Sequence, residues 1–111
     1  MQSIDVGVDF HPRLANRDKK QGDGKYNAID FRNKYLQPLD AKEQWKIQEP
    51  YIGFDFKNVN KIGPSFANEA FAYFAKYASP ELILKRIQLI NTTEVQLRII
   101  KAELNAGYNR E

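Results

Sequence analysis

The chain has no cysteine and only one histidine, and these two shortages remove several kinds of chemistry at once. Without cysteine there is no disulfide, no thiolate nucleophile and no cysteine-ligated metal. His11 cannot form a histidine pair for zinc, and no G-x-S-x-G sequence supplies a serine for it to activate. The glycines at Gly22 and Gly24 lack the lysine–serine pair of a phosphate-binding loop. We therefore expect a protein that is not an enzyme and that carries no cofactor or metal.

The chain also lacks long apolar runs and a strong charge of either sign. No run approaches the ~18–20 apolar residues of a membrane span. The first residues do not show the basic and then apolar segments of a signal peptide, so we expect a cytoplasmic protein with no membrane contact. The net charge of +3, from 17 basic and 14 acidic residues, is too small to indicate a nucleic-acid-binding protein.

What the chain does contain is enough apolar material for one domain. It has 111 residues, of which 42% are hydrophobic and 13% aromatic, so we expect a single globular domain over residues 1–111. Alternating apolar residues predict strands, and apolar residues three to four apart predict helices. Strands are predicted over Ser3–Phe10, Tyr51–Phe56 and Leu84–Ile90, and helices over Tyr26–Leu36, Phe66–Tyr77 and after Asn91. Strands and helices thus alternate along the chain, and this order predicts an α/β fold.

Capping residues predict where the helices begin and end. Asn27 is the expected cap of the first helix, and Ser79 with Pro80 is typical of the start of a short helical turn. Asn91, followed by Glu94, is the expected start of the last helix, and Gly107 its end. The apolar stripe predicted for this helix consists of Val95, Ile99, Ile100, Ala102 and Leu104.

The most informative segment is Tyr51–Phe74, in which a strand leads through Gly63 and Pro64 to Ser65 and then to a helix. A serine at this point has two roles that are compatible with each other. Its hydroxyl can cap the helix by accepting a hydrogen bond from a backbone N–H, worth about 1 kcal/mol. A phosphate on the same hydroxyl would alter any partner surface around it by adding negative charge.

Basic residues crowd into the segment Arg13–Lys25, which we expect to be a solvated loop. The alternative is an electrostatic contact surface for a protein, or weak nucleic-acid binding with Arg32 and Lys34 adding charge. Most of the aromatic residues fall at core spacing, so we expect them to pack inside the protein rather than to stack on bases.

Several short motifs spread over most of the chain resemble the STAS-like domains of bacterial and mobile-element proteins. They are VDF at Val8–Phe10, Arg17, FR at Phe31–Arg32, FDF at Phe54–Phe56, IGPSFANEAF at Ile62–Phe71 and LINTTEV at Leu89–Val95. The resemblance implies a small α/β domain in which a mixed sheet carries helices mainly on one face.

The resemblance also implies a function, because these domains are similar to the anti-sigma-factor antagonists. Those proteins bind a kinase-like partner instead of catalysing a reaction, and a serine at a helix start is phosphorylated to release the partner. Ser65 matches that serine in position, whereas Gly63 and Pro64 replace the Asp-Ser pair and Phe66 replaces the glycine.

On this basis we expect a regulatory module that docks a protein, such as a histidine-kinase-type ATPase, through Ile62–Glu69. The candidate contact residues are Arg17, Arg32, Gly63, Pro64, Phe66 and Glu69, with Ser65 as a contact or phosphorylation site. An inhibitor of a host enzyme, encoded by a mobile element, is an alternative that the sequence does not separate from this one. The identity of the partner and the oligomeric state stay open.

Overall fold

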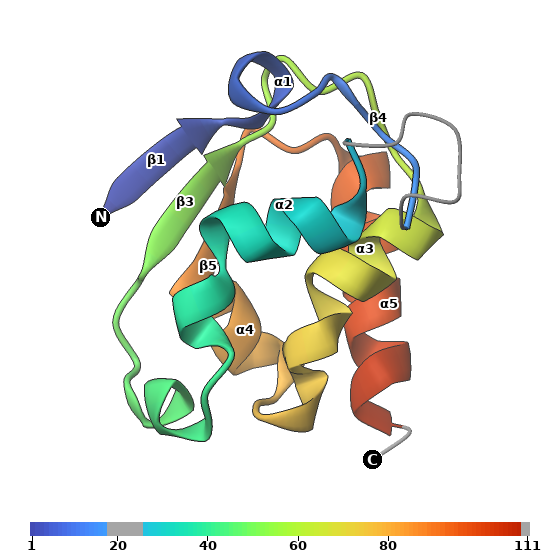
Figure 1. Ribbon diagram of the computed structural model, residues 1–111. Helices are drawn as coiled ribbons and strands as arrows, with labels where there is room; N and C mark the ends of the chain where they lie inside the picture. Colours follow the sequence, from blue (N-terminus) through green and yellow to red (C-terminus); the bar gives the residue numbers. More distant parts are fainter. Residues whose placement is uncertain (18–25, 110–111) are drawn as a thin grey trace.

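Figure 1 shows the computed structural model of the chain, which describes residues 1–17 and 26–109. Strands β1 (Gln2–Asp5), β3 (Ile52–Asp55) and β5 (Ile87–Ile90) form a parallel sheet in the order β1-β3-β5. Strands β2 (Arg13–Leu14) and β4 (Lys61–Ile62) form a second parallel pair. The expected α/β class is confirmed, and the pairings between these strands are all parallel rather than mixed.

Five α-helices and three 3-10 helices are found among the described residues. The α-helices are α1 (Val6–Asp9), α2 (Ala28–Tyr35), α3 (Pro64–Ala70), α4 (Pro80–Arg86) and α5 (Glu94–Asn109). The 3-10 helices are η1 (Gln37–Leu39), η2 (Lys42–Lys46) and η3 (Ala72–Lys76). No helix in the described part of the chain is both long and apolar enough to cross a membrane.

Helices cover one face of the three-stranded sheet, as the sequence led us to expect. On that face the ring centroid of Phe54 lies 4.9 Å from that of Phe31 in α2 and 6.1 Å from that of Phe71. On the opposite face, the atoms nearest to Gly53 come from the adjoining strands and the N-terminal residue. The core therefore lies between the sheet and the helices.

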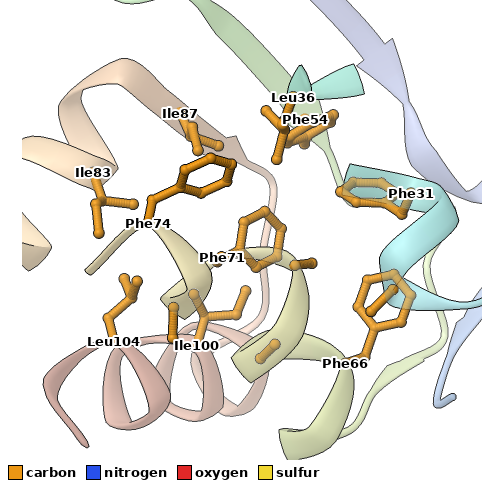
Figure 2. Packing of buried hydrophobic residues seen from close by; sticks show 14 of the residues in the cluster. Phe31, Leu36, Phe54, Phe66, Phe71, Phe74, Ile83, Ile87, Ile100 and Leu104 are labelled. Atoms are coloured by element: carbon orange, nitrogen blue, oxygen red, sulfur yellow. The ribbon is translucent and has the colours of Figure 1, made fainter. Parts of the chain in front are cut away.

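Aromatic and aliphatic residues occupy different parts of this core. Figure 2 shows Phe71 at its centre, with Phe31 and Phe66 on one side and Phe74 on the other. Aliphatic side chains of α4, β5 and α5 complete the Phe74 side: Ile83, Ile87, Ile100 and Leu104. Six of the seven phenylalanines and Trp45 are thus core residues, as their spacing predicted, whereas the tyrosines are half-buried or, like Tyr108, exposed.

The first strand is shorter than predicted, because it ends at Asp5 and is followed by helix α1. The Asp5 carboxylate accepts a hydrogen bond from the Val8 N–H (3.3 Å) and thereby caps α1. Val8, expected to point inward from a strand, is 70% exposed. Apolar residues alternate over all eight positions, and this pattern predicts one long strand. The pattern does not show that an aspartate in the middle caps a helix, so it missed α1.

Two helical segments differ in length from the prediction. The helix predicted over Phe66–Tyr77 is divided into α3 and η3. Ser79 does cap a helix, since its hydroxyl accepts from the Leu82 N–H (3.3 Å), but that helix extends to Arg86. The predicted strand Leu84–Ile90 therefore begins only at Ile87. A short apolar run fits a buried strand and a buried helix equally well, so its pattern could not place this boundary.

The start of α5 is capped by Thr93 rather than by Asn91. The Gln96 N–H donates to the Thr93 hydroxyl (3.1 Å), and the Thr93 N–H donates to the Gln96 side chain (3.0 Å). This reciprocal pair is a capping box. Asn91 instead adopts a φ of 59° in the turn before the helix.

The buried stripe of α5 also differs from the prediction. Ile100 and Leu104 are buried together with Gln96, whereas Val95 and Ala102 are exposed. Gly107 does not end the helix but lies within it, where a Cβ would come within 3.2 Å of the Ala72 Cβ. The glycine therefore permits α5 to pack closely against η3.

Candidate interaction surface

The turn into α3 is built by Gly63 and Pro64. The Gly63 N–H donates to the Leu14 carbonyl (2.8 Å), which attaches the turn to β2. Gly63 is the N-cap of α3 and Pro64 its first residue, so Ser65 lies inside the helix and makes no capping hydrogen bond. The prediction that Ser65 caps this helix is therefore wrong. Pro64 is exposed and Ser65 half-buried.

Phe66 does not belong to the surface. Its side chain is 0% exposed. Its ring centroid lies 5.4 Å from that of Phe31 and 6.3 Å from that of Phe10, in edge-to-face contacts. The expectation of a contact residue is thus corrected: Phe66 anchors the start of α3 in the core.

Arg32 and Glu69 are brought together by the fold, but they bind each other. Arg32 Nη1 lies 2.7 Å from Glu69 Oε2 and 2.6 Å from the Glu69 backbone carbonyl. The same guanidinium lies over the Tyr73 ring, 3.7 Å from its centroid. These contacts hold α2 against α3 and η3. Arg32 and Glu69 therefore fix the position of α3 and are not free to bind a partner through these groups.

Tyr73, which contacts Arg32, also belongs to a polar network that the sequence did not indicate. Tyr73 and Tyr77 both donate their hydroxyl hydrogen bonds to the Asp40 carboxylate, at 2.8 and 2.7 Å. These hydrogen bonds, from Tyr77 and then Tyr73, lower the pKa of Asp40. Lys76 lies 4.0 Å from the same carboxylate. Asp40 lies 33 and 37 positions before Tyr73 and Tyr77 in the sequence, so only the fold assembles the network.

The basic segment lies largely outside the described residues, which include it only as far as Arg17. Arg17 is exposed, and its backbone carbonyl accepts a hydrogen bond from the Ile29 N–H (3.3 Å). The solvated loop expected over Arg13–Lys25, and the contact surface that was its alternative, therefore fall mostly beyond the part that the structure describes.

Two aspartates stand side by side where β1 and β3 end. Asp5 and Asp55 are register partners, and Lys57 Nζ lies 3.9 and 3.7 Å from their carboxylates. The Lys57 backbone N–H and then the Asn91 side chain lower the pKa of Asp55 by donating hydrogen bonds to it. In residues 1–17 and 26–109 no group of three or more acidic or histidine side chains could hold a metal ion.

A hollow of about 410 Å³ lies beside the turn, between β4 and the start of α5. Val59 and Ile62 are buried at this hollow, whereas Val95 is 59% exposed. The other described lining residues are Asn60, Lys61, Thr93, Gln96 and Ile99. Sequence reasoning missed this feature because Val95 falls on the apolar stripe that predicted burial.

A family model described as the STAS-like domain of unknown function (DUF4325) matches residues 27–97, which is 71 of the 111 residues. The match begins at the cap of α2 and ends at the fourth residue of α5, so it includes α3 and every described residue that lines the hollow except Ile99. No curated protein and no solved structure matches the chain.

Proposed function

The chain belongs to the STAS-like domain family, and we propose that it is a non-catalytic regulatory module that docks a protein partner. The proposed docking surface consists of the turn Gly63–Ser65 and the adjoining hollow lined by Val59, Ile62, Val95 and Ile99. It overlaps the segment Ile62–Glu69 that the sequence singled out, and it adds the start of α5.

The hollow is the observation that carries this proposal. Its volume of about 410 Å³ is in the range of pockets that accept a ligand or a large side chain. Buried Val59 and Ile62 give it an apolar wall, and Val95 exposes a large apolar side chain beside it. An apolar anchor from a partner would remove this surface from water, which is how a few residues supply most of the binding energy at protein interfaces.

Lys61 suggests the chemistry of the partner. It is exposed, and it is the only charged residue among the described residues that line the hollow. A partner that combines an apolar anchor with a nearby carboxylate would complement this surface. The partner class we propose, from the resemblance to anti-sigma-factor antagonists, is a histidine-kinase-type ATPase.

The rigidity of α3 supports a docking role. Phe66 holds the start of the helix in the core, and the Arg32–Glu69 ion pair at 2.7 Å holds its end against α2. A surface that is already ordered loses little conformational entropy on binding, and so retains more of the contact energy as affinity. Ser65, whose hydroxyl is not used as a cap, is half-buried in the turn of this surface.

The test is affinity capture from native lysate with the full chain as bait. We expect a specific protein to be retained by the wild type and lost with Val95→Asp, which places a charge beside the apolar wall, and weakened by Ser65→Glu. Lys85→Asp is the matched control, since Lys85 is exposed on α4 and lines none of the hollow.

Retention that is equal for all variants, or no retained protein at all, would contradict the proposal. The identity of a retained protein then separates two cases. An ATPase would support the regulatory role, whereas a metabolic or nucleic-acid enzyme inhibited by the chain would support the mobile-element inhibitor.

A further inference from the structure

The sheet of β2 and β4 is open at the edge that belongs to the docking surface. Each strand has two residues, and β2 is the only described strand that pairs with β4. A sheet of two short strands is marginally stable, and its free edge can pair with another chain. The residues Val59–Ile62, which include β4, line the hollow. The free edge of β4 therefore lies at the docking surface.

The register of the two strands shows where the backbone groups of Ile62 point. In a parallel pair, a residue on one strand bonds to the two residues that flank its partner on the other. Leu14 is the register partner of Ile62, and the Leu14 carbonyl accepts a hydrogen bond from the Gly63 N–H (2.8 Å). The N–H and C=O of Ile62 itself therefore point away from β2, towards the free edge.

These two backbone groups have no hydrogen-bond partner within residues 1–17 and 26–109. Ile62 is only 2% exposed, yet it lines the hollow. A buried backbone group that stays unpaired costs about 1–3 kcal/mol, so in the free protein both groups depend on water inside the hollow. An extended chain that places its own N–H and C=O there would replace that water without losing its hydrogen bonds.

The outer face of the two strands favours an acidic residue in a third strand. Arg13 and Lys61 are register partners on this face, and both are exposed. Like charges directly opposite each other destabilise a sheet, so a carboxylate next to Lys61 would offset their repulsion. Side chains alternate between the two faces of a strand. The residues before and after this carboxylate would thus point to the inner face, where Val59 and Ile62 form the apolar wall of the hollow.

We propose that the docking surface binds an extended segment of the partner as a third strand beside β4, with the sequence pattern apolar–acidic–apolar. This inference rests on the proposed function and adds how the partner is recognised. Main-chain hydrogen bonds to Ile62 supply affinity, and the side chains at Lys61 and in the hollow supply specificity. A helix is disfavoured as the occupant, because its N–H and C=O groups are bonded internally except at its ends.

A library of random linear peptides of about a dozen residues, displayed on phage, is selected on the immobilised full chain. We expect the apolar–acidic–apolar pattern to be enriched, without proline inside it, since proline has no N–H to donate. The Kd of one selected peptide, labelled with fluorescein, is then measured by fluorescence anisotropy. Lys61→Glu should raise this Kd about tenfold or more, and should prefer a peptide in which lysine replaces the acidic residue. Lys85→Glu, exposed on α4 away from the hollow, should leave the Kd unchanged.

Methylation of the peptide's backbone nitrogens, one at a time, tests the strand itself. Because alternate N–H groups of a strand face a given neighbour, methylation at every second residue should raise the Kd about tenfold or more, with little effect at the residues between. Uniform effects along the peptide, an unchanged Kd for Lys61→Glu, or no selected peptide would overturn the proposal.

Failure of this inference is distinguishable from failure of the proposed function. A native protein that is retained from lysate and lost with Val95→Asp, together with uniform methylation effects, would overturn strand addition and leave the docking role intact. Alternating methylation effects without any retained native protein would support strand addition and contradict the regulatory role.

Discussion

The stability lost on substituting Phe66 and Ser65 distinguishes the observed turn, in which Phe66 is buried, from a turn in which Ser65 caps the helix. Phe66→Ala removes a fully buried ring that makes edge-to-face contacts with Phe10 and Phe31. Such a truncation costs about 3–5 kcal/mol, from lost burial and the cavity that remains. With an unfolding entropy of about 2.1 cal/mol/K per residue over 111 residues, the Tm falls by roughly 13–21 °C.

Ser65→Ala should behave very differently, because the Ser65 hydroxyl caps nothing. A half-buried serine without that hydrogen bond contributes within about 0.5 kcal/mol, or roughly 2 °C in Tm. Both variants are measured by thermal and urea unfolding followed by circular dichroism. A loss of about 1 kcal/mol or more for Ser65→Ala, together with a smaller loss for Phe66→Ala, would refute the described turn and restore the capping serine.

Three further predictions test other parts of the fold by urea unfolding. Thr93→Ala should cost about 1 kcal/mol by removing the cap of α5, whereas Thr92→Ala, the adjacent threonine, should cost less than about 0.5 kcal/mol; equal losses would contradict the capping box. Gly7→Ala should cost about 3 kcal/mol or more, because its Cβ would overlap a backbone carbonyl, while Gly63→Ala meets no atom closer than 3.8 Å and should cost within about 1 kcal/mol. The lowered pKa of Asp40 stabilises the protein fully above its unfolded pKa of about 3.9, and this contribution is lost as the pH falls through the lower folded value. Asp40→Asn should therefore reduce stability at pH 7 and flatten its decline below about pH 4, and an unchanged pH dependence would exclude this role.

The elements that the sequence placed well are those whose signals are local. Asn27 caps α2 as predicted, because its side chain accepts from the Asp30 N–H three residues on (2.9 Å). Ser79 caps α4 for the same reason. The strand around Phe54 was recognised from a short run of aromatic and apolar residues bounded by turns. The two caps depend on hydrogen bonds between residues three positions apart, and the strand was recognised from the composition of one short run, although its pairing with β1 and β5 is long-range.

The candidate site was only half predictable. The segment Gly63–Ser65 was recognised as a turn into a helix, and it does lie at the surface. The roles within it were misassigned, because Pro64 at the first helical position makes Gly63 the cap and places Ser65 in the helix. The hollow beside the turn depends on residues of β4 and α5 that lie more than 30 positions apart, so no local pattern contains it.

By itself, the sequence determined the α/β class and the family. Apolar periodicity and short motifs can be read from neighbouring residues, without knowing how the helices and strands pack together. Tertiary structure decided which of several apolar side chains are buried where the pattern left more than one choice. It buried Phe66 against α2 and exposed Val95, and it joined Arg32 to Glu69 across 37 positions of sequence. The physical reason is that a helical stripe reports how apolar a flank is, whereas its burial depends on which other elements reach it.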